Sequence, residues 1–377
     1  MRYITAATVV LSVRVNALSL SPKSLAVVAN EEAIEAYKAG TLTSKQPGVG
    51  NNQPELRRNI IMKALADALI GAHSDADLCG ADSVHDGNFL RFLESAFVRW
   101  ESELHSDTSY LAQTDGVDER IALVPFHCTK STKPRSTGLP AEFACYMSDF
   151  ETPISSSTAQ TLRDDLGVVR TSVEHVAAAA DAAVYAATVH PGHHAGPQYT
   201  SGFCYVNNAC VACALLLARG MQPALLDLDF HGGNGSFDCV AEASTLKGLW
   251  FKSVHCSASY PWVDMAEAAV ELPAGTDADD YCKALGATLD TLPASTDVLV
   301  VSLGYDTLES DPEAGKRSGG LCLKTETFCA IGEALARACR RVIIVQEGGY
   351  DLDAIPAAAQ ALIRGLTSSC ASGSRWA

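Results

Sequence analysis

The sequence predicts a single α/β domain with three layers, in which helices cover both faces of a mainly parallel central sheet. Its second half contains four short apolar runs rich in Val, Leu and Ile, at residues 223–228, 248–254, 297–303 and 341–346. Helix-like stretches at 279–289 and 326–339 lie between them. Continuous apolar strands that alternate with helices are typical of a parallel sheet buried on both faces. With 377 residues and 47% hydrophobic content, the chain is long enough to bury one large core.

The first half of the chain is predicted to be mainly helical. Helices are expected at residues 32–42, 54–72, 86–100 and 172–187, the last of them rich in Ala. The third of these stretches has apolar residues on one helical face, namely Phe89, Phe92, Leu93, Ala96, Phe97 and Trp100. Residues 127–140 are rich in Ser, Thr, Lys and Pro, so we expect an exposed loop there.

The first 30 residues differ from the rest of the chain. They contain basic residues but no acid before Glu31, and residues 3–13 are mostly apolar. Interspersed Arg and Ser without acids are typical of organellar presequences, whereas an apolar stretch is typical of a secretory signal. We therefore expect a targeting segment at residues 1–30, ahead of one domain at 31–377. The destination stays open, with mitochondrion and plastid both considered. The alternative is an ordinary first strand and loop in a cytoplasmic protein.

The composition limits the classes of partner. The formal net charge of −16 argues against a nucleic-acid partner, whose phosphates require a basic face. An acidic surface suits a cationic amine substrate, although the same charge also serves solubility. No run of 18 apolar residues occurs, so we expect no membrane span. The thirteen cysteines are scattered through a long chain, which is typical of reduced, mostly buried thiols.

Residues with metal-binding chemistry follow the apolar run at 223–228. Asp229 and His231 are two residues apart, so on an extended segment their side chains point to the same side. A carboxylate and an imidazole that converge in this way are two of the ligands that zinc prefers. The alternative is a capped turn, because Asp, Asn and Gly after a strand are common turn residues.

Two further motifs follow the apolar runs at 297–303 and 341–346. Asp306 is a candidate third ligand, and three protein ligands leave the open position that a catalytic zinc keeps for water. Tyr350 follows two glycines, which let the backbone approach a ligand closely. The phenol of Tyr350 can donate to a developing oxyanion. A helix cap and a packed turn are the respective alternatives.

A pair of adjacent histidines can supply acid–base chemistry. His193 and His194 lie in a loop that contains glycine, so both can face a cleft, one as base and one as acid. Two imidazoles in different protonation states need different partners. Asp227 and Asn234 are the available orienting groups, one charged and one neutral. A histidine pair on the surface is the alternative.

Together and in this order, the motifs resemble the histone deacetylase superfamily, which has the arginase/deacetylase fold. The resemblance is carried by PGHHA at 191–195, GFCYVNN at 202–208, DLDFHGGNG at 227–235, SLGYD at 302–306 and EGGY at 347–350. Weaker similarity extends it to about residues 50–365. Within the superfamily the chain is most similar to acetylpolyamine amidohydrolases, and Gly232 stands where histone deacetylases more often have a second histidine.

The resemblance implies a deacetylase with one catalytic Zn²⁺. Asp229, His231 and Asp306 would bind this ion, while His193 and His194 would act on the attacking water and the leaving amine. The other implied site residues are Asp227 and Asn234, which orient the two histidines; Tyr350, which polarises the carbonyl; and Gly202, Phe203 and Gly349, which line the substrate site. By analogy with relatives, the resemblance also implies a homodimer and a structural K⁺ held by backbone oxygens near Asp227, Asp229 and His231, together with Ser253.

The expected substrate is an N-acetyl amide on a cationic amine, either acetyl-lysine in a protein or an acetylpolyamine. Val189 and His190 stand where the family usually has Arg-Pro, and acids that grip the substrate cannot be aligned in residues 100–150, so the choice stays open. Another small acylamide is an alternative substrate. A catalytically silent acyl-lysine binder would require a missing ligand or a missing tyrosine. An arginase-like ureohydrolase with two Mn²⁺ ions would need carboxylates at Gly233 and Gly304.

Overall fold

The centre of the protein is an eight-stranded sheet. The computed structural model describes residues 23–43, 52–104, 107–111, 122–128, 134, 138–257, 259–314 and 319–368. The strand order is β2-β1-β5-β10-β9-β6-β7-β8, and every pairing is parallel. The strands are β1 Ser24–Asn30, β2 Leu69–Ala72, β5 Ala182–Ala186, β6 Pro223–Asp227, β7 Phe251–Cys256, β8 Ala269–Leu272, β9 Val298–Leu303 and β10 Arg341–Gln346.

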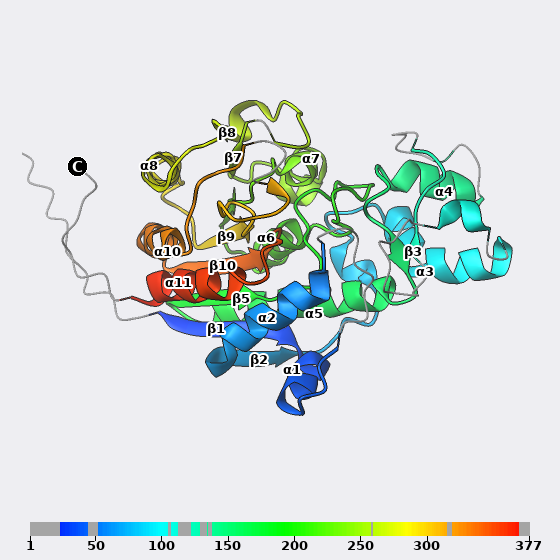
Figure 1. Ribbon diagram of the computed structural model, residues 1–377, viewed down its shortest axis with the longest axis horizontal. Coiled ribbons are helices and arrows are strands. Elements are labelled where there is room, and N and C mark those ends of the chain that lie inside the picture. The colour runs from blue at the N-terminus through cyan, green and yellow to red at the C-terminus, as the bar shows by residue number, and fades with distance from the viewer. Residues whose placement is uncertain are drawn as a thin grey trace, which may run out of the picture.

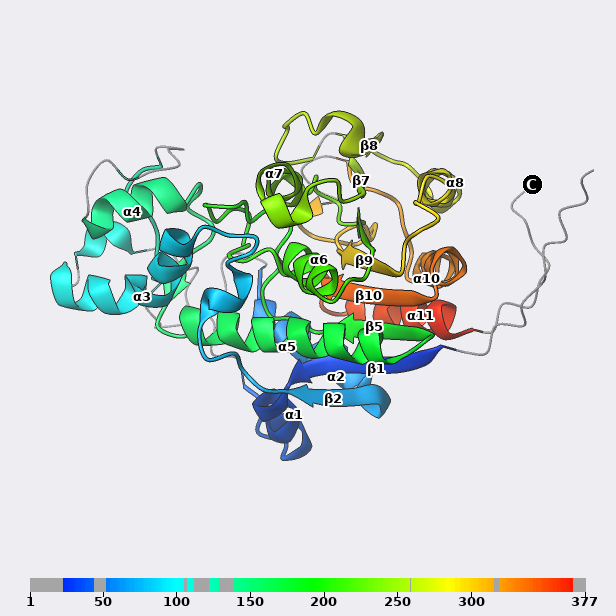
Figure 2. The same cartoon turned by 180° about the vertical axis from the view of Figure 1, so that it is seen from behind.

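Helices cover both faces of this sheet, as the sequence predicted (Figures 1 and 2). One face carries α5 Thr158–Ala178, α6 Asn208–Ala218 and α7 Asn234–Glu242. The other carries α1 Glu31–Lys38, α2 Pro54–Ala64, α8 Ala278–Leu289, α10 Thr327–Ala338 and α11 Ile355–Thr367. Each face buries its own hydrophobic core, so the predicted three-layer α/β/α architecture is confirmed.

A smaller lobe extends from one end of the sheet (Figure 1). It contains α3 Gly87–Glu103, α4 Leu139–Tyr146 and an antiparallel pair of strands, β3 Ala122–Leu123 and β4 Ile154–Ser155. The predicted apolar face of α3 packs here, with Phe92 edge-on against Phe143 of α4 at 5.3 Å between ring centroids. Short 3-10 helices are η1 Ala66–Ala68, η2 Leu78–Ala81, η3 Thr108–Tyr110, η4 Ser244–Leu246 and η5 Ala266–Ala268. Within the described residues, no helix is long and apolar enough to cross a bilayer.

Two of the predicted helices are wrong in part. The helix expected at 54–72 ends at Ala64, and its last residues form β2, which pairs with β1 through Val27 and Leu69. The helix expected at 172–187 is α5, which ends at Ala178, and its Ala-rich continuation is β5. All five residues of β5 are buried between β1 and β10. Small apolar side chains are suited to such a position, so tertiary pairing overrides the helix propensity of alanine.

The end of the predicted targeting segment lies within the described residues. Residues 24–30 form β1, a strand within the central sheet. The remainder of the predicted leader, residues 1–22, lies outside the described residues. Most of the loop predicted at 127–140 lies outside them as well, and its last two residues already begin α4.

Candidate active site

The site lies beyond the carboxyl ends of four neighbouring strands, β5, β10, β9 and β6. Each of these strands runs into one of the predicted motifs, and ligands of open parallel sheets bind at this edge. A cavity of about 310 Å³ opens there. Its lining residues are Asp149, Glu151, Pro191, His193, His194, Gly202, Phe203, Asp229, His231, Tyr260, Trp262, Glu313, Gly348 and Tyr350. The fold therefore brings together motifs that are far apart in the sequence.

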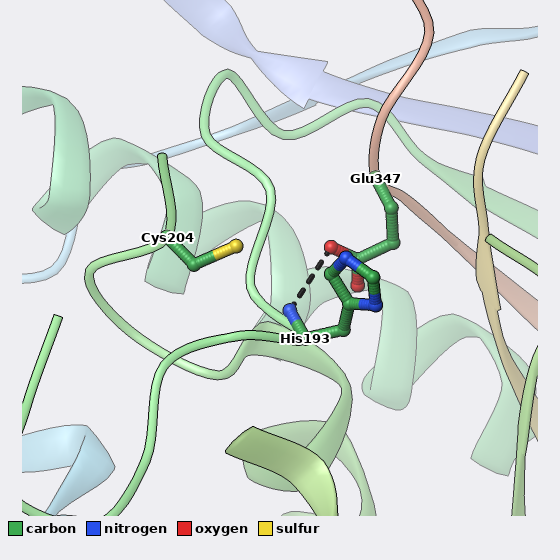
Figure 3. Close-up of side chains that lie close together, drawn as sticks. All are labelled: His193, Cys204 and Glu347. Atoms are coloured by element: carbon green, nitrogen blue, oxygen red, sulfur yellow. Dashed lines mark hydrogen bonds between the residues drawn. The ribbon is translucent and has the colours of Figure 1, made fainter. Parts of the chain in front are cut away.

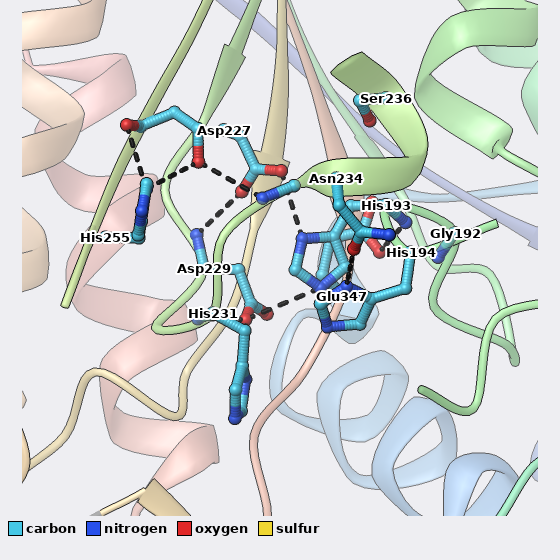
Figure 4. Close-up of polar contacts among 12 residues, drawn as sticks. Gly192, His193, His194, Asp227, Asp229, His231, Asn234, Ser236, His255 and Glu347 are labelled. Atoms are coloured by element: carbon cyan, nitrogen blue, oxygen red, sulfur yellow. Dashed lines mark hydrogen bonds and ion pairs between the residues drawn. The ribbon is translucent and has the colours of Figure 1, made fainter. Parts of the chain in front are cut away.

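The three predicted metal ligands, Asp229, His231 and Asp306, converge at the cavity floor, and Figure 4 shows two of them, Asp229 and His231. The Nδ1 atom of His231 lies 3.1 Å from Asp229 Oδ1 and 3.0 Å from Asp306 Oδ2. One donor atom from each residue lies within 4.8 Å of the other two. Both carboxylates are fully buried, and burial together with the charge of Asp229 raises the pKa of Asp306 to about 7. Two buried acids side by side need a cation, and this set of one imidazole nitrogen and two carboxylate oxygens fits zinc.

Glycines leave the space in which these carboxylates sit. A Cβ atom at Gly304 would overlap Asp229 Oδ2, and one at Gly348 would lie 2.6 Å from Asp306 Oδ2. A Cβ at Gly233 would overlap Asp227 Oδ2. The additional carboxylates that a two-manganese centre would need at positions 233 and 304 therefore have no room.

Each histidine of the pair contacts its predicted partner (Figure 4). His193 Nδ1 lies 3.0 Å from Asp227 Oδ2, and His194 Nδ1 lies 2.6 Å from Asn234 Oδ1. The two imidazole rings are 4.0 Å apart between centroids and line the cavity. Because Nδ1 of each ring is hydrogen-bonded to its partner, Nε2 is the ring atom that can exchange a proton with a substrate or water.

The protein groups push the two imidazole pKa values in opposite directions. Burial lowers the pKa of His193, but the charges of Asp229 and Asp227 outweigh burial and raise it well above its usual value. Burial lowers the pKa of His194, and the positive charges of His193 and His231 lower it further. A cation on the three ligands would lower both. When two neighbouring groups have well-separated pKa values, one can act as an acid and the other as a base.

Tyr350 lines the same cavity as the histidine pair. Its backbone N–H donates to Asp311 Oδ2 at 2.7 Å, which fixes the end of the Glu-Gly-Gly-Tyr motif. Burial raises the pKa of its phenol well above the usual range, although the nearby Arg57 guanidinium opposes this, so the phenol keeps its proton. Gly348, rather than the predicted Gly349, lines the cavity. Gly349 has φ +124°, and a Cβ there would lie 2.7 Å from Tyr305 Cβ, so this glycine allows the turn that presents Tyr350.

Gly202 and Phe203 line the cavity as predicted. Both have positive φ angles, of 52° and 69°. Their N–H groups donate to Asp149 Oδ2 at 2.6 Å and to Thr152 Oγ1 at 2.9 Å. These bonds hold a left-handed turn that costs energy at a phenylalanine, so Phe203 is held at the cavity wall by the loop that follows α4.

Several residues of the site escaped sequence reasoning. The wall and mouth of the cavity contain the acids Asp149, Glu151 and Glu313, the aromatic residues Tyr260 and Trp262, and Arg57 lies behind Tyr350. The three acids come from two separate segments, and the sequence gives no signal that these segments meet at one cavity. The aromatic segment at 260–262 follows β7, and its position after a strand of the sheet was the available signal.

Glu347 is a further residue without a predicted role. It is fully buried, and its Oε2 accepts hydrogen bonds from the N–H groups of Gly192 at 2.5 Å and His193 at 3.1 Å. Figure 3 shows the second of these bonds. Glu347, His193 and Cys204 also bring potential metal-ligand atoms together. Burial raises the pKa of the Cys204 thiol well above its usual value, which disfavours the thiolate that binds metals. Glu347 therefore serves to hold the histidine loop, and its place directly after an apolar strand could have indicated it.

Comparison with known proteins identifies the class. The histone deacetylase domain family matches residues 55–366. Acetylpolyamine amidohydrolase 1 of Pseudomonas aeruginosa is 32% identical over 288 residues, which cover 72% of this chain and 78% of that protein. Histone deacetylase 4 of Caenorhabditis elegans is 30% identical over 195 residues, which cover 47% of this chain and 22% of that protein.

A solved structure shares the fold. The crystal structure of acetylpolyamine aminohydrolase from Burkholderia pseudomallei aligns with a TM-score of 0.74 at 23% identity, and the alignment covers 92% of this chain and 99% of that one. The family match and the named relatives together define a class of hydrolytic enzymes. The chain belongs to the histone deacetylase domain family and is a hydrolytic deacetylase.

Proposed function

We propose that this deacetylase binds one catalytic zinc ion through Asp229, His231 and Asp306, and that its preferred substrate is an acetylpolyamine. The observation that carries the substrate choice is the acidic wall of the cavity. Asp149, Glu151 and Glu313 line the same cavity as the histidine pair. A deacetylase acting on a small polycation would benefit from carboxylates in the same cavity as the reacting amide, whereas the neutral backbone around an acetyl-lysine would not.

The charge and aromatic content of the mouth support a cationic substrate. The whole chain carries a formal net charge of −16, and a cleft lined with one sign of charge concentrates the opposite ion. Tyr260 and Trp262 also line the cavity. Aromatic faces attract ammonium groups by about 0.5–1 kcal/mol at exposed sites. Together these groups favour an alkylammonium chain that extends from the acetamide toward the mouth.

The residues of the floor have separate roles in the proposed reaction. When bound, zinc would polarise the acetamide carbonyl and lower the pKa of a water molecule toward neutrality. His194 accepts the proton of the attacking water at Nε2 and later passes it to the leaving amine. Tyr350 donates its phenol hydrogen to the developing oxyanion. His193 lines the same centre, and Asp227 orients its imidazole.

The alternatives differ in what they require of the mouth. An acetyl-lysine protein substrate would use the same floor but would not need the three acids. Another small acylamide would be turned over without any preference for a second amine. A silent acyl-lysine binder is disfavoured, because the ligands, the histidine pair and Tyr350 all line one cavity or its floor.

The test compares three substrates on the purified chain before and after chelation. These are acetylputrescine, an acetyl-lysine peptide and an N-acetylalkylamine of equal length without the second amine. We expect activity to disappear on chelation and to return with Zn²⁺, with acetylputrescine favoured over the neutral analogue by at least about tenfold in kcat/KM. Faster turnover of the peptide would reject the polyamine assignment, and turnover of none with zinc bound would reject the function.

The predicted K⁺ site and homodimer stay predictions. Ser253, the side chain implied for the K⁺ site, accepts from Gly233 N–H at 3.3 Å and lies 3.0 Å from His255 Nδ1. We propose that K⁺ binds among the neighbouring backbone oxygens, and thermal unfolding with KCl or with tetramethylammonium chloride tests it.

A further inference from the structure

The two histidines of the site have partners of different kinds. Asp227 offers His193 two equivalent acceptor oxygens. Asn234 offers His194 either an oxygen that accepts or a nitrogen that donates, because its amide has one of each. A reversed Asn234 amide would impose the opposite tautomer on His194. The orientation of this amide therefore decides which ring nitrogen of His194 carries the hydrogen.

A chain of hydrogen bonds runs from Asn234 away from the cavity. Asn234 Nδ2 donates to the hydroxyl of Tyr199 at 3.2 Å, and this hydroxyl donates to Asp238 Oδ2 at 2.6 Å. At the opposite end of the amide, Asn234 Oδ1 lies 2.6 Å from His194 Nδ1. Asn234 and Asp238 both belong to α7, and Tyr199 lies in the loop after the histidine pair.

The carboxylate of Asp238, at the end of this series of hydrogen bonds, fixes which atom donates in each bond. Asp238 as a carboxylate can only accept, so the single hydrogen of the Tyr199 hydroxyl is used toward it. The Tyr199 oxygen then has only lone pairs for Asn234, which must present Nδ2. With the amide reversed, two oxygens would face each other with no hydrogen between them. Burial and the charge of Asp238 raise the pKa of Tyr199, so its hydroxyl remains a donor.

We propose that Tyr199 and Asp238 are positioning residues that hold His194 in the tautomer with hydrogen on Nδ1 and a lone pair on Nε2. This inference rests on the proposed function, in which that lone pair takes the proton of the attacking water. A new N–H bond forms at Nε2 while one water O–H bond breaks, and the electron pair stays on the oxygen that attacks the carbonyl carbon. The other tautomer already carries hydrogen at Nε2 and cannot accept this proton.

The first experiment allows the series of hydrogen bonds to run in either direction while it keeps side chains of nearly the same size. In Asp238→Asn, the introduced amide can donate to the Tyr199 hydroxyl, which can then donate to a reversed Asn234. We expect kcat to fall on the order of tenfold, with KM and the melting temperature nearly unchanged. Tyr199→Phe, which leaves the Asn234 amide without a partner on that side, should lower kcat at least as much.

The matched control is Glu242→Gln. Glu242 is exposed and belongs to the same helix as Asp238. A second cavity, separate from the one that the histidine pair lines, is lined by Glu242, Asp238 and Tyr199. The substitution removes the same charge from the same wall but touches no member of the hydrogen-bonded chain. We expect native kcat and KM. A loss in kcat equal to that of Asp238→Asn would mean that charge alone acts, and would overturn the proposal.

The second readout does not depend on activity. Nitrogen-15 NMR of the histidine side chains, with His194→Ala for assignment, reports which ring nitrogen is protonated. We expect the Nδ1–H form for His194 in the native chain and a substantial share of the Nε2–H form in Asp238→Asn. An unchanged tautomer in Asp238→Asn overturns the proposal, whatever happens to kcat. A native chain that turns over no acylamine would reject the proposed function, and the tautomer comparison would still decide this inference.

Discussion

The floor of the cavity and its mouth are built in different ways. On the floor, Asp229 and Asp306 are fully buried, and each accepts a backbone N–H from a neighbouring segment, that of Gly348 at 2.9 Å and that of Phe230 at 3.0 Å. At the mouth, Trp262 is 76% exposed. The floor therefore inherits its geometry from the sheet, whereas the mouth is formed by loops. Substitutions on the floor should change the chemistry, and those at the mouth should change the choice of substrate.

The largest effect is expected from Tyr350→Phe. The substitution keeps the ring and removes the hydrogen that the phenol donates to the oxyanion, so kcat should fall by about 100–1,000-fold. Steady-state kinetics on the zinc-loaded chain measure this, with zinc content as the control. A kcat within tenfold of the native value would show that Tyr350 does not stabilise the transition state.

Gly304→Ala tests how tightly the glycines enclose the ligands. An added Cβ would overlap Asp229 Oδ2, so the ligand must move, and zinc affinity should fall by about 10–100-fold. Titration with a competing chelator measures the affinity.

The matched control for this glycine lies in α8. A Cβ at Gly286 meets no atom of the described residues within 4 Å, so Gly286→Ala should keep native zinc affinity and raise helix stability by up to about 1 kcal/mol. Equal zinc affinity in the two variants would contradict the enclosed floor.

Glu151→Gln tests whether the acidic residues of the cavity select for a charged substrate. Removing one carboxylate from the cavity wall should lower kcat/KM for acetylputrescine by about tenfold through KM, and leave the neutral acetylalkylamine unaffected. Glu309→Gln, at an exposed carboxylate that is not part of the cavity lining, is the control. Equal losses for both substrates would mean that Glu151 supports the loop and does not select for charge.

The smallest effect is expected from Trp262→Ala. Its exposed ring offers a face to an ammonium group in a region that water screens, so KM for acetylputrescine should rise only about two- to fivefold. The value of kcat should not change, because Trp262 has no part in the chemical steps that we propose for the floor. A fall in kcat measured at saturating substrate would break the separation between floor and mouth.

Much of the floor could be predicted from the sequence. Asp229, His231 and Asp306 each stand within a few residues of a predicted apolar strand, and parallel strands end at a common edge of the sheet. The histidine pair was indicated instead by two adjacent imidazoles in a loop that contains glycine. The α/β architecture could be predicted for the same reason. Strand β5 could not, because its five residues read as the end of an alanine-rich helix until β1 and β10 enclose them.

By itself, the sequence determined which chemical groups the site contains, since metal ligands, imidazoles and a phenol follow the strands in local motifs. Only the tertiary structure decided which strands are neighbours, and therefore that the ends of β5, β10, β9 and β6 meet. It alone also brought Asp149 to the cavity mouth and placed Tyr199 against Asp238, 39 residues further along the chain. The physical reason is that strand order and loop contacts arise from non-local burial and pairing, which no local pattern of residues encodes.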